Sequence, residues 1–446
     1  MRSGNAVARR TPAPVLAATL AAIAISAAGG VTDASATPQT PFYVAPAEIP
    51  AEPGSIIRTE SMPAFLTVPR SADTASPRDA VWPGTAQRIL YTSLTQEGTP
   101  TAVSGTFLEP SGPWRGKGAA PVVVIGPGAI GQGDHCAPSL AFSTGGYIPE
   151  HDPMSFSPNQ EAASAAYWSA LGAKVVVTDY VGMGTPGIHT YTNRIEYGRA
   201  ILDAGRAAIR VSRSASDTPM VLWGYSQGGG ATASAAELQP TYSPELNIKG
   251  AWAGAPPADL VDVLAEIDGA LIGGVIGWAV NSIVAHYPEL KSDLQEKITP
   301  TGKQLLETMS NECIGDVISR HAFFRTESIM RDGRSLLDNV RSTPESMKVF
   351  VEQRIGNIAP EIPVLVTSGR NDDSVPYGQV REMASDWCDR GATVDFRTNE
   401  LPPILPGATL PNHFGPQLID GYSPDGAIQF LLDRLDDKPI HGCSMS

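Results

Sequence analysis

The sequence predicts an α/β fold in which helices cover both faces of a mostly parallel sheet. Short, continuous apolar segments recur along the chain, and stretches with apolar residues at helical spacing lie between most of them. Apolar segments that do not alternate with polar residues are typical of strands buried on both faces. Because the two patterns follow one another repeatedly, we expect a parallel sheet between two layers of helices.

The first 36 residues have the pattern of a signal peptide. Arg2, Arg9 and Arg10 precede the apolar segment PVLAATLAAIAISAAGG, and Ala34–Ala36 then form an A-x-A cleavage pattern. A membrane anchor is the alternative, but the segment is short and rich in alanine, whereas a spanning helix needs about 20 apolar residues. We therefore expect a secreted, extracellular protein. The arginine pair lacks the rest of a twin-arginine pattern, so the export route stays open.

Composition limits the partners that the protein can have. The chain has 446 residues, of which 42% are hydrophobic and only 17% charged, and its net charge is −14. Cleavage after Ala36 would remove three arginines and Asp33 and make this charge −16. A surface this acidic repels nucleic acids and anionic membranes. The length and the hydrophobic content are those of a folded chain with a large core.

The predicted mature chain contains four cysteines, Cys136, Cys313, Cys388 and Cys443. An even number in an oxidising compartment predicts two disulfides, and the sequence positions leave three pairings open. The spacing includes no C-x-x-C motif and no histidine–cysteine cluster of the kind that binds zinc. We expect neither a metal nor another cofactor.

The expected strands follow an N-terminal arm, residues 37–80, that is rich in proline, alanine and serine. QRILYTSLT and TAVSGTFLEP predict two antiparallel strands joined by a turn at Glu97-Gly98. Five continuous apolar strands come next: APVVVIG (120–126), AKVVVTD (173–179), PMVLWG (219–224), IKGAWAG (248–254) and IPVLVTSG (362–369). NQEAASAAYWSALG and RAILDAGRAAIRVSR, which lie between them, have the apolar spacing of helices.

Residues 257–357 interrupt this alternation. The region has no clear buried strand and only helical patterning, so we interpret it as a helical cap. It separates two parts of one α/β core, residues 81–256 and 358–446.

One segment of the predicted cap, Gly269–Ala285, is uncharged over 17 residues. A membrane span is a weak alternative here, because the segment is short and contains four glycines. Gly273, Gly277 and Asn281 recur every four residues and predict a narrow stripe where another helix approaches closely. We expect this segment to be a helix that lines the substrate site.

The stretch VLWGYSQGGGATA, residues 221–233, predicts a nucleophilic serine. Ser226 stands in a G-x-S-x-G motif, after a predicted buried strand and before a helix of small residues. This is the nucleophile elbow of the α/β-hydrolase fold in its strand–turn–helix context. The flanking positions require glycine because larger side chains would collide with neighbouring backbone in so tight a turn. A serine that only begins a helix is the alternative.

A serine nucleophile needs a base, and in this fold the chain order is serine, acid, histidine. Of the seven histidines, only His413 and His441 follow the last strong strand. His413 lies in LPNHFGP, a loop between the strand-like TVDFRTNE and the final helix. His441 lies in the terminal tail beside Cys443. We therefore predict His413 as the base and interpret His441 as a surface residue.

The acid should follow the strand IPVLVTSG. Asp372 comes three residues after Gly369, which puts it at the carboxyl end of that strand, where ligands bind in open α/β sheets. Asp373 is its direct neighbour and its rival for the role. We predict Asp372 as the acid and interpret Asp373 as a residue that caps the turn.

A tetrahedral oxyanion needs two backbone N–H donors. The residue after the nucleophile, Gln227, supplies one of them. The second should come from the glycine-rich loop GPGAIGQGDHC, which follows the early strand, and we predict Gly131. A glycine-rich surface loop without a catalytic role is the alternative.

Together these segments resemble the secretory lipase family of bacteria and fungi, cap-bearing α/β-hydrolases similar to the yeast-type lipase A. The matching stretches cover nearly all of the predicted mature chain and are GQGDHCAPS, VVVTDYVGMGTPG, EYGRAILDAGRAA, LWGYSQGG, GAWAGAPP, GRNDDSVPY and NHF. The resemblance implies a triad of Ser226, Asp372 and His413. Some members carry an acidic residue near the position of Gly131, which leaves the second oxyanion donor open.

The same resemblance implies how the cysteines pair. It joins Cys136 to Cys313, the cysteine of the cap, and Cys388 to the C-terminal Cys443.

The pattern as a whole predicts a secreted serine ester hydrolase, a lipase or carboxylesterase that cleaves acyl esters such as triacylglycerols through an acyl-enzyme intermediate. Two alternatives stay open. The first is a secreted serine peptidase of the same fold, because a triad can hydrolyse amides as well as esters. The second is a non-catalytic, hydrolase-like binding protein. The expected partners are an acyl ester or lipid substrate and, transiently, a lipid interface. The sequence indicates no stable protein partner.

Overall fold

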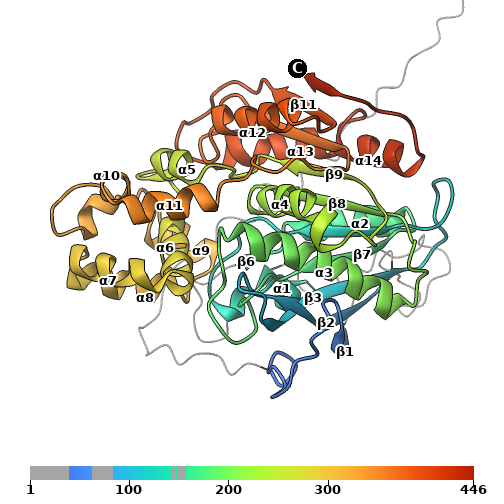
Figure 1. The fold of residues 1–446 in the computed structure, drawn as a ribbon, viewed down its shortest axis with the longest axis horizontal. Helices are drawn as coiled ribbons and strands as arrows, with labels where there is room; N and C mark the ends of the chain where they lie inside the picture. Colours follow the sequence, from blue (N-terminus) through green and yellow to red (C-terminus); the bar gives the residue numbers. More distant parts are fainter. Residues whose placement is uncertain (1–39, 63–83, 143–145, 148–156) are drawn as a thin grey trace, which may run out of the picture. The chain divides into compact units, whose positions relative to one another are not determined.

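A ten-stranded sheet runs through the protein (Figure 1). The computed structural model describes residues 40–62, 84–142, 146–147 and 157–446, and Thr37–Ser446 form one compact unit. The predicted signal peptide lies outside the described residues. In spatial order the strands are β1 (Ile56–Met62), β2 (Gly84–Leu94), β3 (Pro100–Pro110), β7 (Lys174–Thr178), β4 (Val122–Gly126), β8 (Met220–Tyr225), β9 (Ile248–Gly254), β10 (Val364–Gly369), β11 (Val394–Asn399) and β12 (Cys443–Met445).

The type of strand pairing changes once across this sheet. The pairs from β1 to β7 are antiparallel, and all pairs from β7 to β12 are parallel. The predicted hairpin is present as β2 and β3, with Tyr91 opposite Val103. The five predicted apolar strands are β4, β7, β8, β9 and β10, and their residues are almost all buried. These features confirm the predicted fold class.

Two strands of the sheet were not predicted, and both lie at its edges. β1 belongs to the predicted N-terminal arm, of which only residues 40–62 are described. It is half-exposed, and β12 is fully exposed. Edge strands without a buried face lack the hydrophobic pattern by which a strand is recognised. A further small pair, β5 (Gly146–Tyr147) and β6 (Ser157–Pro158), stands apart from the sheet.

Helices cover both faces of the sheet, as predicted. Successive side chains of β8 show the two faces, because neighbours on a strand point in opposite directions. Gly224 faces Thr232 on α4, whereas Trp223 contacts Trp168 on α2 and Tyr422 on α13. The helices of the core are α1 (Pro138–Ala141), α2 (Glu161–Ala170), α3 (Arg194–Ser212), α4 (Gln227–Tyr242), α12 (Tyr377–Asp389), α13 (Gly415–Tyr422) and α14 (Ala427–Leu435).

Between β9 and β10 the chain forms a series of short helices, which we call the helical insertion (residues 260–352). Figure 1 shows most of them grouped at one end of the sheet. They have a hydrophobic cluster of their own that includes Trp278, Met309 and Val317. These helices are α5 (Leu260–Ile267), α6 (Val275–His286), α7 (Pro288–Lys297), α8 (Pro300–Met309), α9 (Ile314–Arg320), α10 (Leu336–Arg341) and α11 (Pro344–Glu352).

The helix predicted for Gly269–Ala285 is shorter than expected. It begins at Val275, and the residues before it form turns, with Gly269 at a φ of +96°. The part of the predicted glycine stripe that lies on α6 does approach another helix. A Cβ on Gly277 would lie 2.3 Å from Met309 Sδ on α8, and the side chain of Asn281 donates to Leu306 O at 2.8 Å. No helix in the described ranges has the length and apolar character that crossing a bilayer requires.

Two disulfides join distant parts of the chain. Cys136, in the loop after β4, is bonded to Cys313 in the helical insertion. Cys388 on α12 is bonded to Cys443 on β12. Both predicted pairings are therefore confirmed.

Candidate active site

Ser226 occupies the turn between β8 and α4. Its backbone has a φ of 59° and a ψ of −124°, a combination that is disfavoured for a residue with a Cβ. Two backbone hydrogen bonds hold the turn: Ser226 N donates to Gly254 O on β9, and Gly230 N donates to Ser226 O, both at 2.9 Å. Sheet and helix together fix the serine at the carboxyl edge of the central strands.

The glycines on either side of Ser226 are required by close packing. A Cβ on Gly224 would lie 2.0 Å from Gly228 O, and a Cβ on Gly228 would lie 2.0 Å from Gly126 O on β4. No side chain fits at such distances without moving the backbone. This is the steric reason for the G-x-S-x-G motif that the sequence contains.

The structure brings His413 next to Ser226. His413 lies in η3 (Leu410–Phe414), a single π-helical turn, and its Nε2 is 2.8 Å from Ser226 Oγ. The imidazole is 1% exposed. Tyr225, the residue before the serine, donates its hydroxyl proton to His413 O at 2.6 Å. The Tyr225 hydroxyl thus joins the elbow to the histidine loop, in addition to the contact between His413 and Ser226.

The two neighbouring aspartates have different partners. Asp372 Oδ2 and Oδ1 lie 2.8 and 3.0 Å from His413 Nδ1, and Oδ1 also accepts from Ser374 N and Val375 N. A carboxylate only accepts, so Nδ1 carries the proton and Nε2 is left to accept from the serine hydroxyl.

Asp373 instead accepts at Oδ2 from Gly407 N at 2.8 Å and Thr409 N at 3.1 Å. It therefore holds the loop that leads to His413 and makes no contact with the imidazole. His441, the other late histidine, is exposed and lies just before β12.

Of the two residues predicted to supply oxyanion donors, one lines a cavity beside Ser226 and the other does not. Gln227 is the first residue of α4, is 3% exposed, and lines a cavity together with Ser226. Gly131 does not line this cavity. It forms a β-bridge with Cys313, and a Cβ on it would lie 2.5 Å from Cys136 Sγ. The residue of the same loop that lines the cavity is Ala129.

An apolar cavity opens beside Ser226 and His413. The empty space there, including the part open to solvent, is about 930 Å³, and much of its wall comes from the helical insertion, including Leu264, Val275 and Ile276. A second hollow within the insertion, about 490 Å³ on the same measure, shares four lining residues with the first, Val280, Ile283, Leu336 and Phe350. The apolar space beside the serine therefore continues into the insertion.

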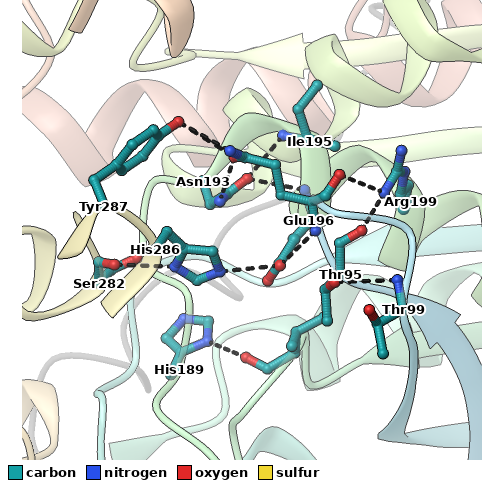
Figure 2. A network of polar contacts seen from close by, with 12 residues as sticks. Thr95, Thr99, His189, Asn193, Ile195, Glu196, Arg199, Ser282, His286 and Tyr287 are labelled. Atoms are coloured by element: carbon teal, nitrogen blue, oxygen red, sulfur yellow. Dashed lines mark hydrogen bonds and ion pairs between the residues drawn. The ribbon is translucent and has the colours of Figure 1, made fainter. Parts of the chain in front are cut away.

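A polar junction that the sequence did not reveal joins α6 to α3 (Figure 2). Figure 2 shows His286 between Ser282 and Glu196: Nδ1 is 3.0 Å from Ser282 O, and Nε2 is 3.0 Å from Glu196 Oε1. Both partners only accept, so the imidazole carries two protons and forms an ion pair with the carboxylate. Burial alone would lower the pKa of His286, but Glu196 outweighs burial and raises it. The two residues are 90 positions apart, so no local sequence pattern predicts their contact.

Among the described residues, one group of side chains has the composition of a metal site. Within the part of the chain that the structure describes, His135, Cys136 and Cys313 are the group whose ligand atoms lie close together. Both sulfurs are used in the disulfide that joins Cys136 to Cys313. The described residues thus offer no group of free ligands for an ion.

Comparison with known proteins gives a family and several relatives. A family model described as secretory lipase matches residues 161–442. Lipase 4 of Candida albicans is 29% identical over 80% of this chain and 75% of its own length. A secreted triacylglycerol lipase of Malassezia restricta is 27% identical over 92% of this chain and 83% of its own length. A protein of Mycobacterium tuberculosis named probable inactive lipase is 28% identical, with coverage of 90% and 82%.

Solved structures support the same fold. Candida antarctica lipase A matches with a TM-score of 0.74 at 20% identity, over 92% of this chain and 90% of that chain. The rice cell wall degrading esterase LipA from Xanthomonas oryzae matches with a TM-score of 0.65 at 19% identity, over 87% and 98%. Similarity at these identities establishes the architecture, an α/β-hydrolase fold.

Proposed function

The chain belongs to the secretory lipase family and is a lipase-like carboxylic ester hydrolase, and on this basis we propose that it cleaves acyl esters such as triacylglycerols with Ser226 as the nucleophile. One observation carries the proposal: hydrogen bonds run without a break from Ser226 through His413 to Asp372. In such a chain the histidine activates the serine, and the acid orients the histidine.

In the first half of the proposed reaction, Ser226 Oγ attacks the ester carbonyl while His413 Nε2 takes its proton. Asp372 keeps the Nδ1 tautomer in place and stabilises the imidazolium that forms. The imidazolium then gives its proton to the leaving alcohol, and the acyl group stays on Ser226. In the second half, His413 takes a proton from water and the hydroxide attacks the acyl-enzyme. The bond to Ser226 Oγ then breaks, the imidazolium returns its proton to that oxygen, and the fatty acid leaves.

The negative charge on the carbonyl oxygen needs two N–H donors. We assign them to Gln227 N and Ala129 N. The position of Ala129 in the cavity wall beside Ser226 and Gln227 supports this choice, whereas Gly131 lies against the disulfide. Replacing a donor by proline removes its N–H. Ala129→Pro should therefore lower kcat about a hundredfold or more with the melting temperature unchanged. Unchanged kcat in this variant would return the role to Gly131, where a proline Cβ would collide with the disulfide and a matched control is not possible.

The apolar cavity supports the proposal that the protein recognises its substrate by the acyl chain. A chain of methylene groups gains free energy by leaving water for such a wall. We propose that the helical insertion acts as the cap that supplies this wall. Exposed apolar side chains in the histidine loop and on α13, namely Ile404, Leu405, Leu410 and Leu418, support a transient contact with a lipid interface.

Three substrates separate this proposal from its rivals. Purified protein is assayed with nitrophenyl esters of increasing chain length, with emulsified triglyceride and with a peptide anilide. Ester hydrolysis that disappears in Ser226→Ala supports the proposal. Anilide hydrolysis without ester hydrolysis would indicate a peptidase. No turnover of any substrate, together with no labelling by a fluorophosphonate, would indicate a binding protein, a possibility that one relative's name raises.

Secretion is proposed from the sequence of the first 36 residues and from the family. Edman sequencing of the protein recovered from culture medium should begin at Thr37. Recovery of an intact N-terminus in the cell pellet would contradict it.

A further inference from the structure

A buried histidine lies behind the first residue of α4. His189 belongs to the loop between β7 and α3 and is fully buried. Its Nε2 is 3.1 Å from the side-chain nitrogen Nε2 of Gln227, whose main-chain N–H is the proposed oxyanion donor. The mechanism described above does not use this imidazole.

The partners of His189 determine its protonation state. Nδ1 lies 3.1 Å from Val181 O, which can only accept, so Nδ1 carries a proton. Nε2 then has a free lone pair and accepts from the amide of Gln227. Burial lowers the pKa of His189 to about 4, although Glu196 acts in the opposite direction. The imidazole is therefore neutral near pH 7, as an acceptor must be.

Neighbouring groups fix this imidazole in place. The rings of Tyr180, Tyr191 and Tyr197 enclose it, with centroid distances of 5.9, 6.1 and 6.1 Å. Its main-chain oxygen accepts from Gln132 Nε2 at 3.1 Å. These contacts restrict the position of His189 Nε2, so the amide of Gln227 that donates to it is restricted as well.

The elbow has few other anchors. From Gly224 to Gly230, only Tyr225 and Gln227 carry a side chain apart from the nucleophile. Tyr225 is bonded to the histidine loop through His413 O, and Gln227 is bonded to His189. The two anchors thus tie the turn to loops on different sides of the site. The Gln227 side chain also bonds to the Tyr197 side chain on α3. Loss of the His189 contact leaves it without a polar contact to the loop between β7 and α3.

We propose that His189 is a positioning residue for ester hydrolysis, because its Nε2 holds the side chain of Gln227 and thereby aims the main-chain N–H of Gln227 at the oxyanion. This inference rests on the proposed function of Ser226. The benefit is confined to states in which the carbonyl oxygen is negatively charged. Substrate binding in the ground state does not depend on it.

Replacement of the acceptor tests this role. His189→Phe keeps a ring and removes both nitrogens, and we expect kcat for a soluble nitrophenyl ester to fall about tenfold to a hundredfold, with KM changed less than twofold. His189→Gln restores an acceptor at similar reach and should recover most of kcat. Gln227→Met keeps the main-chain N–H but removes the donor, so its kcat should fall by a similar factor.

A double-mutant cycle tests the connection itself. If His189 acts through Gln227, the variant with both His189→Phe and Gln227→Met loses no more activity than either single variant. Additive losses would overturn the proposal. A boronic acid that forms a tetrahedral adduct with Ser226 provides a second readout, and its inhibition constant should rise by the factor by which kcat falls.

Val122→Ala is the control for a loss of stability. Val122 lies at the end of β4 that is remote from the elbow. This variant removes buried methyl groups and should lower the melting temperature without changing kcat or boronate affinity. If His189→Phe does the same and no more, the histidine is merely structural and the proposal is wrong. If His189→Phe does not fold, Gln227→Met alone decides. Wild-type activity that depends on Ser226 but not on His189 would refute only this inference, whereas an inactive wild type would refute the proposed function.

Discussion

The sheet core and the helical insertion differ in how they are built and in what they contribute. Strands such as β4 and β8 are buried along their whole length, and one large hydrophobic cluster surrounds them. The insertion consists of helices of at most 12 residues around a smaller cluster. All three members of the proposed triad come from the core, whereas much of the cavity wall comes from the insertion. On the proposed function, chemistry depends on the sheet core and the fit of the substrate on the insertion.

The sharpest test of the core is removal of its nucleophile. Ser226→Ala should lower kcat for ester hydrolysis by about 10⁶, because no other group can form the acyl-enzyme. Circular dichroism and the melting temperature should remain those of the wild type, since only one oxygen is lost. Residual activity above about one hundredth of the wild type would move the nucleophile to another residue.

The next test uses the same substitution at adjacent positions of the core. Asp372→Asn should lower kcat by about 10⁴, because the amide no longer fixes the tautomer of His413. Asp373→Asn is the matched control. Its amide oxygen can still accept from Gly407 N and Thr409 N, so its loss should be far smaller. Steady-state kinetics on one soluble ester gives both values, and the reverse order would reassign the acid.

A change in the insertion should affect specificity rather than chemistry. Val275→Trp places a large ring in the cavity wall and should reduce activity on long-chain esters more than on acetate esters. Each lost methylene contact is worth about 0.8 kcal/mol, or roughly fourfold in kcat/KM. Ala285→Trp, on the exposed side of the same helix, is the control and should change neither. Equal losses on short and long esters would mean that α6 only packs the fold.

The smallest expected effect is at the junction of the two regions (Figure 2). Burial alone would raise the pKa of Glu196, but the hydrogen bonds from His286 and Gln96 N outweigh burial and lower it. The pKa of His286 is raised by Glu196, and Glu97 adds to this effect. The histidine stabilises the fold fully below its unfolded pKa of about 6.5, and this contribution disappears as pH rises through its folded pKa. The Glu196 carboxylate stabilises the fold fully above its unfolded pKa of about 4.3, and this contribution disappears as pH falls through its lower folded pKa.

His286→Gln should therefore reduce the free energy of unfolding by about 1–2 kcal/mol at pH 5.5 and by less at pH 9. Urea denaturation at the two pH values measures the difference, and Glu196→Gln should show the same dependence. A loss that is equal at both pH values would mean that packing, not charge, joins α6 to α3.

The sequence by itself determined the core and the choice of the proposed reacting groups. Buried parallel strands are continuous apolar segments, and the elbow needs glycines at fixed positions, so both leave a local pattern. For the same reason Ser226, Asp372 and His413 could be proposed from their places after strands. The resemblance to secretory lipases supplied the disulfide pairing, which spacing alone left open.

The tertiary structure decided what depends on partners distant in sequence. The helix predicted from Gly269 begins at Val275, because the main chain before it is bonded elsewhere: Gly269 N donates to Phe324 O, and Leu271 N donates to Gly407 O. The structure distinguishes Asp372, which meets the imidazole of His413, from Asp373, which meets main-chain N–H groups of the same loop. It also places Ala129 rather than Gly131 in the cavity wall. The contacts of His286 with Glu196 and of His189 with Gln227 join residues 90 and 38 positions apart. No local periodicity encodes such pairs, because packing of the insertion and the loops against the sheet creates them.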